Sequence, residues 1–133
     1  MPNQRVLIDT SIWVEYFRDR NHKLVAAVKD LIMNQHALLC GVVLSELLAG
    51  VKVKKDREAL KQTLDALEYA ETSRSTWISA GEVSSRSRLQ GIGVPLTDLL
   101  LAALALENGS DIFTLGNHFD RIPEVKRFYP AKP

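Results

Sequence analysis

Cysteine, net charge and long apolar runs are all scarce in this sequence, and each scarcity excludes a class of protein. The only cysteine is Cys40, so no intrachain disulfide can form and a reducing cytoplasm is the expected setting. Lysine and arginine (17) nearly balance aspartate and glutamate (16), so affinity for nucleic acid must come from local clustering of basic residues. The longest apolar runs, such as 99–106, are too short to span a membrane, and the N-terminus lacks the pattern of a signal peptide.

What remains is the composition of an ordinary globular protein. Hydrophobic residues make up 46% and charged residues 25% of 133 positions, which suits one domain over residues 1–133. Neither a repeat nor a linker interrupts the chain. Short β-branched runs alternate with longer segments of helical period, and this alternation is typical of an α/β fold with a mostly parallel sheet between layers of helices.

The apolar periodicity predicts where the elements lie. Strands are expected at 6–8, 38–40 and 112–115, with a last one at 125–129. Helices are expected at 10–17, 23–35, 42–48, 54–70, 76–90 and 96–107. Gly50 and the pair Asn108-Gly109 suit the C-terminal ends of two of these helices.

Three acids stand among apolar neighbours, and they are the informative feature of the chain. Asp9 follows the first strand, at the sheet edge where parallel α/β proteins bind ligands. Glu46 has only apolar or small residues three and four positions away, and a carboxylate on such a face is costly unless something pairs with it. Asp98 opens the Leu/Ala-rich helix after Pro95. In a parallel sheet, the junctions that carry these acids can converge.

Converging carboxylates repel one another, so they need a cation to remain ionised together. Oxygen ligands without histidine or cysteine favour Mg²⁺ or Mn²⁺ over zinc. Such an ion polarises a phosphoryl oxygen and generates a hydroxide nucleophile. The hypothesis is a metal site made of Asp9, Glu46 and Asp98.

Each acid also has a purely structural explanation. Asp98 could cap its helix, Asp9 could belong to a turn, and Glu46 could pair with Arg5 or Lys52. The three acids together make these explanations less economical than one shared site.

Four segments resemble, in order, the motifs of the PIN-domain family. They are VLIDTSIWVEYF with Asp9, LCGVVLSELLAG with Glu46, PLTDLLLAALALENG with Asp98, and IFTLGNHFDRIP as the closing motif. The ordered set covers nearly the whole chain, and it is most similar to the VapC-like toxins of toxin–antitoxin pairs.

The resemblance implies a three-layer PIN-like fold and a Mg²⁺- or Mn²⁺-dependent endoribonuclease. Such a toxin cleaves structured RNA, for example tRNA or ribosomal RNA, with a metal-activated water. It forms a homodimer and is inhibited by a cognate antitoxin. Carried over by position, Asp9, Glu46 and Asp98 would be the catalytic and metal-binding residues.

The chain departs from the family at its closing motif. A fourth acid often lies two residues after the threonine, but Thr114 is followed here by Leu115 and Gly116. The missing acid puts in doubt whether the site binds a second metal ion and whether the enzyme is fully active. Asn117 could hold a metal-bound water, and Asp120 is a weak substitute for the missing acid. Asp111 is expected to begin its strand at the opposite edge.

Other polar residues have a functional and a structural interpretation side by side. Thr10 and Ser11 could contact the metal shell or a phosphate, or could cap the helix. Thr114 could orient Asp9 or a water, or be an ordinary strand residue. For His118 a structural role is favoured.

Basic and aromatic residues also allow two readings. The basic groups are plausible phosphate contacts, although a solvated helix face is the commoner explanation of such runs. They are Lys52, Lys54, Lys55, Arg57 and Lys61, and then Arg74, Arg86 and Arg88. Trp13, Tyr16 and Phe17 suit the core or a protein contact better than base stacking.

One rival hypothesis stays open, and another is weak. Because of Gly116, the chain could be a PIN domain that binds RNA or a protein partner without cutting. An aspartyl phosphatase needs a second aspartate two residues after Asp9, and Ser11 stands there.

Overall fold

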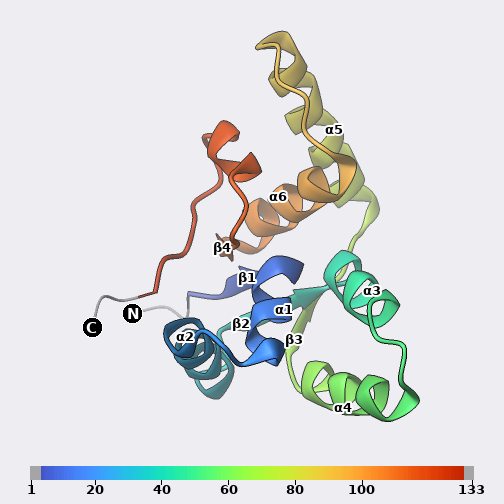
Figure 1. Ribbon diagram of the computed structural model, residues 1–133. Helices are drawn as coiled ribbons and strands as arrows, with labels where there is room; N and C mark the ends of the chain where they lie inside the picture. The colour runs from blue at the N-terminus through green and yellow to red at the C-terminus, as the bar shows by residue number, and fades with distance from the viewer. Residues whose placement is uncertain (1–3, 131–133) are drawn as a thin grey trace.

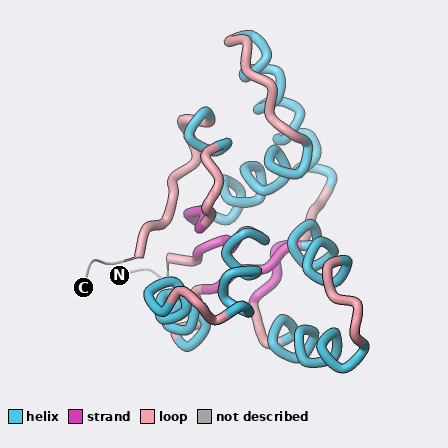
Figure 2. Tube along the Cα trace, viewed as in Figure 1, coloured by secondary structure: helices cyan, strands magenta, loops and turns pink. Residues whose placement is uncertain are grey.

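A four-stranded parallel sheet organises the chain. In the computed structural model, which describes residues 4–130, the strand order is β3-β2-β1-β4 (Figures 1 and 2). The strands are β1 (Val6–Ile8), β2 (Ala37–Cys40), β3 (Glu68–Ala70) and β4 (Asp111–Phe113). β1 pairs with both β2 and β4, and every pairing is parallel. The carboxyl ends of all four strands therefore lie at one edge of the sheet.

Helices connect the strands and cover the sheet. They are α1 (Thr10–Arg18), α2 (His22–Met33), α3 (Gly41–Ala49), α4 (Lys54–Asp65), α5 (Arg74–Leu89) and α6 (Leu96–Asn108), and a short 3-10 helix, η1 (His118–Arg121), follows β4. The order moves from β1 to β3 and then back to β4. Right-handed crossovers therefore place α5 and α6 on the face opposite α1 to α4. Figure 1 shows α5 and α6 above the sheet, with α2 and α4 below it.

The predicted three-layer α/β architecture is confirmed, and its core lies where the sequence is most apolar. β1 and β2 are buried along their whole length, as expected for parallel strands covered on both faces. All seven residues from Leu99 to Ala105 are buried, because α6 packs against β1 and β4 on one side and α5 on the other. No helix within residues 4–130 is long and apolar enough to cross a membrane.

The main error of the sequence prediction is the helix expected over 54–70. That helix ends at Asp65, and Glu68–Ala70 forms the edge strand β3. Leu60 and Leu64 carry a genuine helical period, whereas the strand has only three residues, two of them exposed. So short an edge strand offers too few residues for an alternating pattern to show.

The C-terminal part of the chain also differs from the prediction. β4 ends at Phe113, so Thr114 and Leu115 lie beyond it. The strand expected at 125–129 is a single parallel bridge between Ile112 and Arg127. Gly109 ends α6 with a left-handed φ of 61°, whereas Gly50 ends α3 with an ordinary φ of −81°.

Candidate active site

Asp9 lies at the carboxyl end of β1, and its carboxylate is held from several directions. It is the N-cap of α1, where its Oδ1 accepts from the Thr10 backbone N–H at 2.8 Å. Its Oδ2 accepts from the hydroxyls of Thr114 at 2.8 Å and Ser11 at 3.1 Å. The structural role of Asp9 is thus that of a helix cap, not that of a turn residue. However, a cap needs only one of these contacts, and the convergence of the other two fixes the direction of the carboxylate.

The residues that hold Asp9 are themselves held by the segment after β4. The backbone N–H of Leu115 donates to Ser11 Oγ at 3.1 Å, and that of Gly116 donates to Thr114 Oγ1 at 3.0 Å. From the C-terminal segment, Arg127 Nη2 donates to the Thr114 carbonyl at 2.9 Å. No local pattern in the sequence points to Arg127, because this contact depends on how the C-terminal segment returns to β4.

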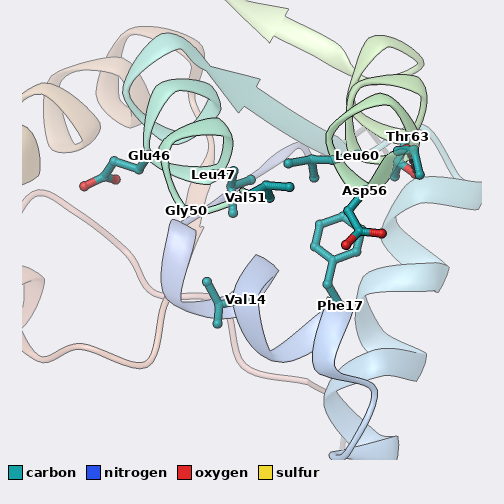
Figure 3. A pocket seen from close by; sticks show the side chains of 10 residues that line it. Val14, Phe17, Glu46, Leu47, Gly50, Val51, Asp56, Leu60 and Thr63 are labelled. Atoms are coloured by element: carbon teal, nitrogen blue, oxygen red, sulfur yellow. Dashed lines mark hydrogen bonds between the residues drawn. The ribbon is translucent and has the colours of Figure 1, made fainter. Parts of the chain in front are cut away.

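Glu46 projects from α3 and is exposed, so the expectation of a costly buried carboxylate is wrong. Of the residues three and four positions away, only Val43 is buried, whereas Ala49 and Gly50 are exposed like the glutamate itself. Figure 3 shows its carboxylate pointing away from the apolar side chains of the adjacent pocket. The salt bridge considered with Arg5 is also absent among the described residues, since Arg5 pairs with Glu68 at 2.8 Å.

Thr10 links the first two acids. Its hydroxyl donates to Glu46 Oε1 at 2.7 Å, while its backbone N–H donates to Asp9. Asp9, just after β1, and Glu46, on α3, therefore both accept a hydrogen bond from Thr10, as expected if the two junctions converge. The Lys52 alternative for Glu46 finds no ion pair within residues 4–130 either.

Asp98 reaches the same edge from α6 but has a partner of its own. Its Oδ2 lies 2.6 Å from His118 Nδ1 in η1, just after β4. Asp98 lies in the first turn of α6, where the helix dipole favours an acid, but the N-cap is Pro95 and no side-chain capping bond forms. The simple cap explanation therefore fails, and His118 is the residue whose proximity the sequence did not reveal.

The arrangement fits a cation held by few protein ligands. Within residues 4–130, no three acids, histidines or cysteines lie close enough together to form a complete metal cage. Mg²⁺ is commonly held by only one or two carboxylates, with water and substrate phosphates completing the shell. Asp9 and Glu46 are the two acids that could provide such a pair of hard oxygen ligands, since both contact Thr10.

The same edge contains a buried thiol. Cys40 ends β2 and has no exposed surface. Burial is the main reason why the pKa of its thiol is raised, and the negative charges of Asp9 and Glu46 raise the pKa further. Backbone N–H groups of Val42 and Val43 act in the opposite direction. The thiol is therefore neutral near pH 7 and adds no fourth anion to the site.

The remaining acids of the closing motif stay away from the site. Asp111 begins β4 at the opposite edge, as predicted. Asp120 pairs with Arg127 at 3.3 Å, so it is committed to the C-terminal segment. Asn117 precedes η1 and makes no side-chain capping bond there.

The predicted basic groups are exposed, and some serve the fold. Arg57 donates to the Val51 carbonyl at 2.7 Å, and Arg86 pairs with Glu124 at 3.0 Å. The aromatic residues of α1 also have a structural role. Trp13 is fully buried, and Phe17, which is 43% exposed, stacks on it and lines the pocket drawn in Figure 3.

Fold and site together define a class: an α/β protein with acids gathered at the carboxyl edge of a parallel sheet. Residues 6–125 match the family model of the PIN domain, and the chain belongs to that family. It is 28% identical to Ribonuclease VapC11 of Mycobacterium tuberculosis over 130 residues, which cover 95% of this chain and 97% of that protein. VapC ribonuclease Mb1587 of Mycobacterium bovis matches to the same extent.

Solved structures share the fold. VapBC2 from Rickettsia felis, bound to a DNA fragment from its promoter, superposes with a TM-score of 0.82 at 23% identity, over 96% of this chain and 100% of the other. FitAcB from Neisseria gonorrhoeae gives 0.79 at 20% identity, over 94% and 97%. At these identities the likeness establishes the arrangement of the sheet and helices.

Proposed function

We propose that the protein is a Mg²⁺- or Mn²⁺-dependent endoribonuclease and the toxin of a toxin–antitoxin pair. The observation that carries the proposal is the convergence of Asp9 and Glu46 at the carboxyl edge, joined through Thr10. The curated relatives that cover nearly the whole chain are named as ribonucleases, which supports RNA as the substrate.

In this proposal Asp9 and Glu46 hold the cation, and Asp98 contributes from the same edge, since no three acids of residues 4–130 stand close enough together to share it directly. When bound, the ion would polarise a phosphoryl oxygen and make a water acidic enough to attack phosphorus. The protein's own contribution is orientation. Thr114 and Ser11 fix the direction of Asp9, and His118 occupies Oδ2 of Asp98 while leaving Oδ1 without a side-chain partner among the described residues.

The partners follow from the same relatives. Structures with this fold include a toxin–antitoxin complex from Klebsiella pneumoniae and a member of the VapBC family of toxin–antitoxin systems from Mycobacterium tuberculosis, and we propose a cognate antitoxin for this chain. A homodimer, a cytoplasmic setting, and structured RNA such as tRNA or ribosomal RNA as the target complete the proposal.

Cleavage of RNA by the purified protein tests it. We expect cleavage with Mg²⁺ or Mn²⁺, none after EDTA, and none by the Asp9→Asn variant, which keeps the shape of the side chain but removes its charge. Asp65→Asn, at the exposed end of α4, is the matched control and should cleave normally. Cleavage that survives both EDTA and Asp9→Asn would contradict the proposal.

A second candidate is a PIN domain that binds RNA or a protein partner without cutting. It is favoured by Gly116 in place of the usual acid and by the incomplete cage among the described residues. Calorimetry with Mn²⁺ separates the two: absence of binding at millimolar metal supports the second candidate, and tight binding supports the nuclease.

A further inference from the structure

A cavity of about 290 Å³ adjoins the acidic edge on the side of β4. Its walls come from the start of α2, from Thr114 and Leu115, and from residues 127–130 of the C-terminal segment. Thr114 both lines this cavity and donates to Asp9 at 2.8 Å, so the cavity begins one residue away from the proposed catalytic acid. We refer to it below as the Lys23–Tyr129 cavity.

The charge of the Lys23–Tyr129 cavity is opposite to that of the acidic edge. Lys23 is exposed and forms no salt bridge with any residue of the described part of the chain. Arg127 donates to the Thr114 carbonyl and lies 3.3 Å from Asp120, which offsets only part of the positive charge. The N-terminus of α2, capped by Asn21, adds the positive end of a helix dipole.

The cavity also presents a flat aromatic surface. Tyr129 is 67% exposed, so much of its ring faces the solvent. The guanidinium carbon of Arg127 lies 5.2 Å from the centre of this ring, a cation–π contact that holds the ring in place. Arg127 is itself anchored to Thr114, so the position of the ring is coupled to the edge that carries Asp9.

We propose that the Lys23–Tyr129 cavity binds one nucleotide of the RNA strand beside the cleaved bond, with Lys23 on its phosphate and Tyr129 stacked on its unpaired base. The inference rests on the proposed ribonuclease function and adds a substrate subsite to it. A basic groove with an exposed aromatic ring is the usual arrangement for single-stranded nucleic acid. An acidic peptide would pair with Lys23, but it would not need the exposed aromatic ring of Tyr129.

Binding of a fluorescent single-stranded oligoribonucleotide to the uncleaving Asp9→Asn protein provides the test, measured by anisotropy over a range of salt. Lys23→Ala should weaken binding and reduce the slope of log K against log salt by about 0.7, the loss of one phosphate contact. Tyr129→Ala should weaken binding about tenfold at every salt concentration, and Tyr129→Phe should restore it. Lys29→Ala, elsewhere on exposed α2 surface, is the matched control and should change neither.

Each outcome has one meaning. If Lys23→Ala and Tyr129→Ala bind RNA as tightly as their parent, the cavity is not a nucleotide site. If they keep RNA binding but lose a complex with the antitoxin, the cavity docks protein and the inference is overturned. If the unmodified protein cleaves no RNA with Mg²⁺ or Mn²⁺, the proposed function fails instead. The binding assay would still report on the cavity, because it does not depend on cleavage.

Discussion

Thr114 Oγ1 donates a 2.8 Å hydrogen bond to Asp9 Oδ2 across 105 residues of sequence. The bond joins the chain just beyond β4 to the end of β1. Thr114 is buried, and its hydroxyl is one of two side-chain donors to that oxygen. The direction of the proposed catalytic carboxylate therefore depends on the segment that follows β4, and not on β1 alone.

Thr114→Val should lower activity more than stability. Valine keeps the shape but leaves Asp9 Oδ2 with Ser11 alone, and loss of a residue that orients a metal ligand typically costs about 10–100-fold in metal affinity or activity. Metal affinity by Mn²⁺ calorimetry and kcat on a short RNA measure the effect. Thr114→Ser, which keeps the hydroxyl, should retain most of both. A valine variant with unchanged kcat and unchanged metal affinity would refute the orienting role.

His118→Ala should weaken metal binding through Asp98. The histidine holds Oδ2 of Asp98 at 2.6 Å, and without it the carboxylate can rotate away from the edge. We expect about tenfold weaker Mn²⁺ affinity, the lower end of the usual range for such partners. His22→Ala, a change of an exposed histidine at the start of α2, is the control. If Asp98→Asn weakens Mn²⁺ binding and His118→Ala does not, Asp98 acts without help from His118.

The raised pKa of Cys40 predicts a loss of stability at high pH. In the unfolded chain the thiol ionises near its ordinary value of 9.0, while burial keeps it protonated in the fold. Below pH 9 both states hold the proton, so the group has no effect. As the pH rises above 9 the unfolded state loses its proton first and is favoured, so the free energy of unfolding falls.

Urea unfolding between pH 7 and pH 10 measures this effect. The free energy of unfolding should fall more steeply above pH 9 for the unmodified protein than for Cys40→Ala. The comparison uses the slope, because the alanine variant is less stable at every pH through its lost packing. The pKa of Tyr69 is raised above its ordinary 10.0 by burial, by Glu71 and by Cys40, so this group stays protonated below pH 10 in both proteins and adds little to either slope. Equal slopes would show that the thiol ionises as easily in the fold as outside it.

The parts of this molecule that could be read from sequence are those with strong local patterns. The strand before Asp9 and the apolar helix after Pro95 have both a clear period and clear ends, and the parallel sheet follows from their alternation. The sequence predicts no strand at β3 because its three residues, two exposed and one buried, are too few to show an alternating pattern. The exposure of Glu46 was misjudged, because apolar neighbours on a helix do not tell which side of it meets the solvent.

The residues of the proposed site also divide into those that local sequence patterns predict and those that they do not. Asp9, Glu46 and Asp98 stand out because each acid has apolar neighbours in the sequence, although Glu46 itself is exposed. His118 and Arg127 act through contacts with Asp98 and Thr114 that exist only once the segment after β4 has folded back. Sequence spacing does not predict such contacts, so only the structure identifies the residues that orient the proposed metal ligands.

Thr76 should be the most sensitive polar residue of the α5–α6 pair. It is fully buried at the start of α5, where its hydroxyl accepts from the Ser73 backbone N–H at 3.0 Å and donates to Glu107 Oε1 near the end of α6. Thr76→Val removes the capping contact and a bond to a charged group, and leaves the Ser73 N–H without that partner. Together these losses should cost about 2–3 kcal/mol of unfolding free energy.

Urea unfolding of matched variants checks this value. Ser75→Ala removes a second bond to Glu107, of 2.9 Å but exposed, and should cost under about 0.5 kcal/mol because water replaces the lost partner. Glu107→Gln keeps a carbonyl acceptor and should lie between the two. RNA cleavage by the fraction still folded should be unchanged in all three, since these residues lie at the far end of α6 from Asp98. A Thr76→Val protein as stable as Ser75→Ala would show that burial adds nothing to this bond, and that apolar packing alone joins α5 to α6.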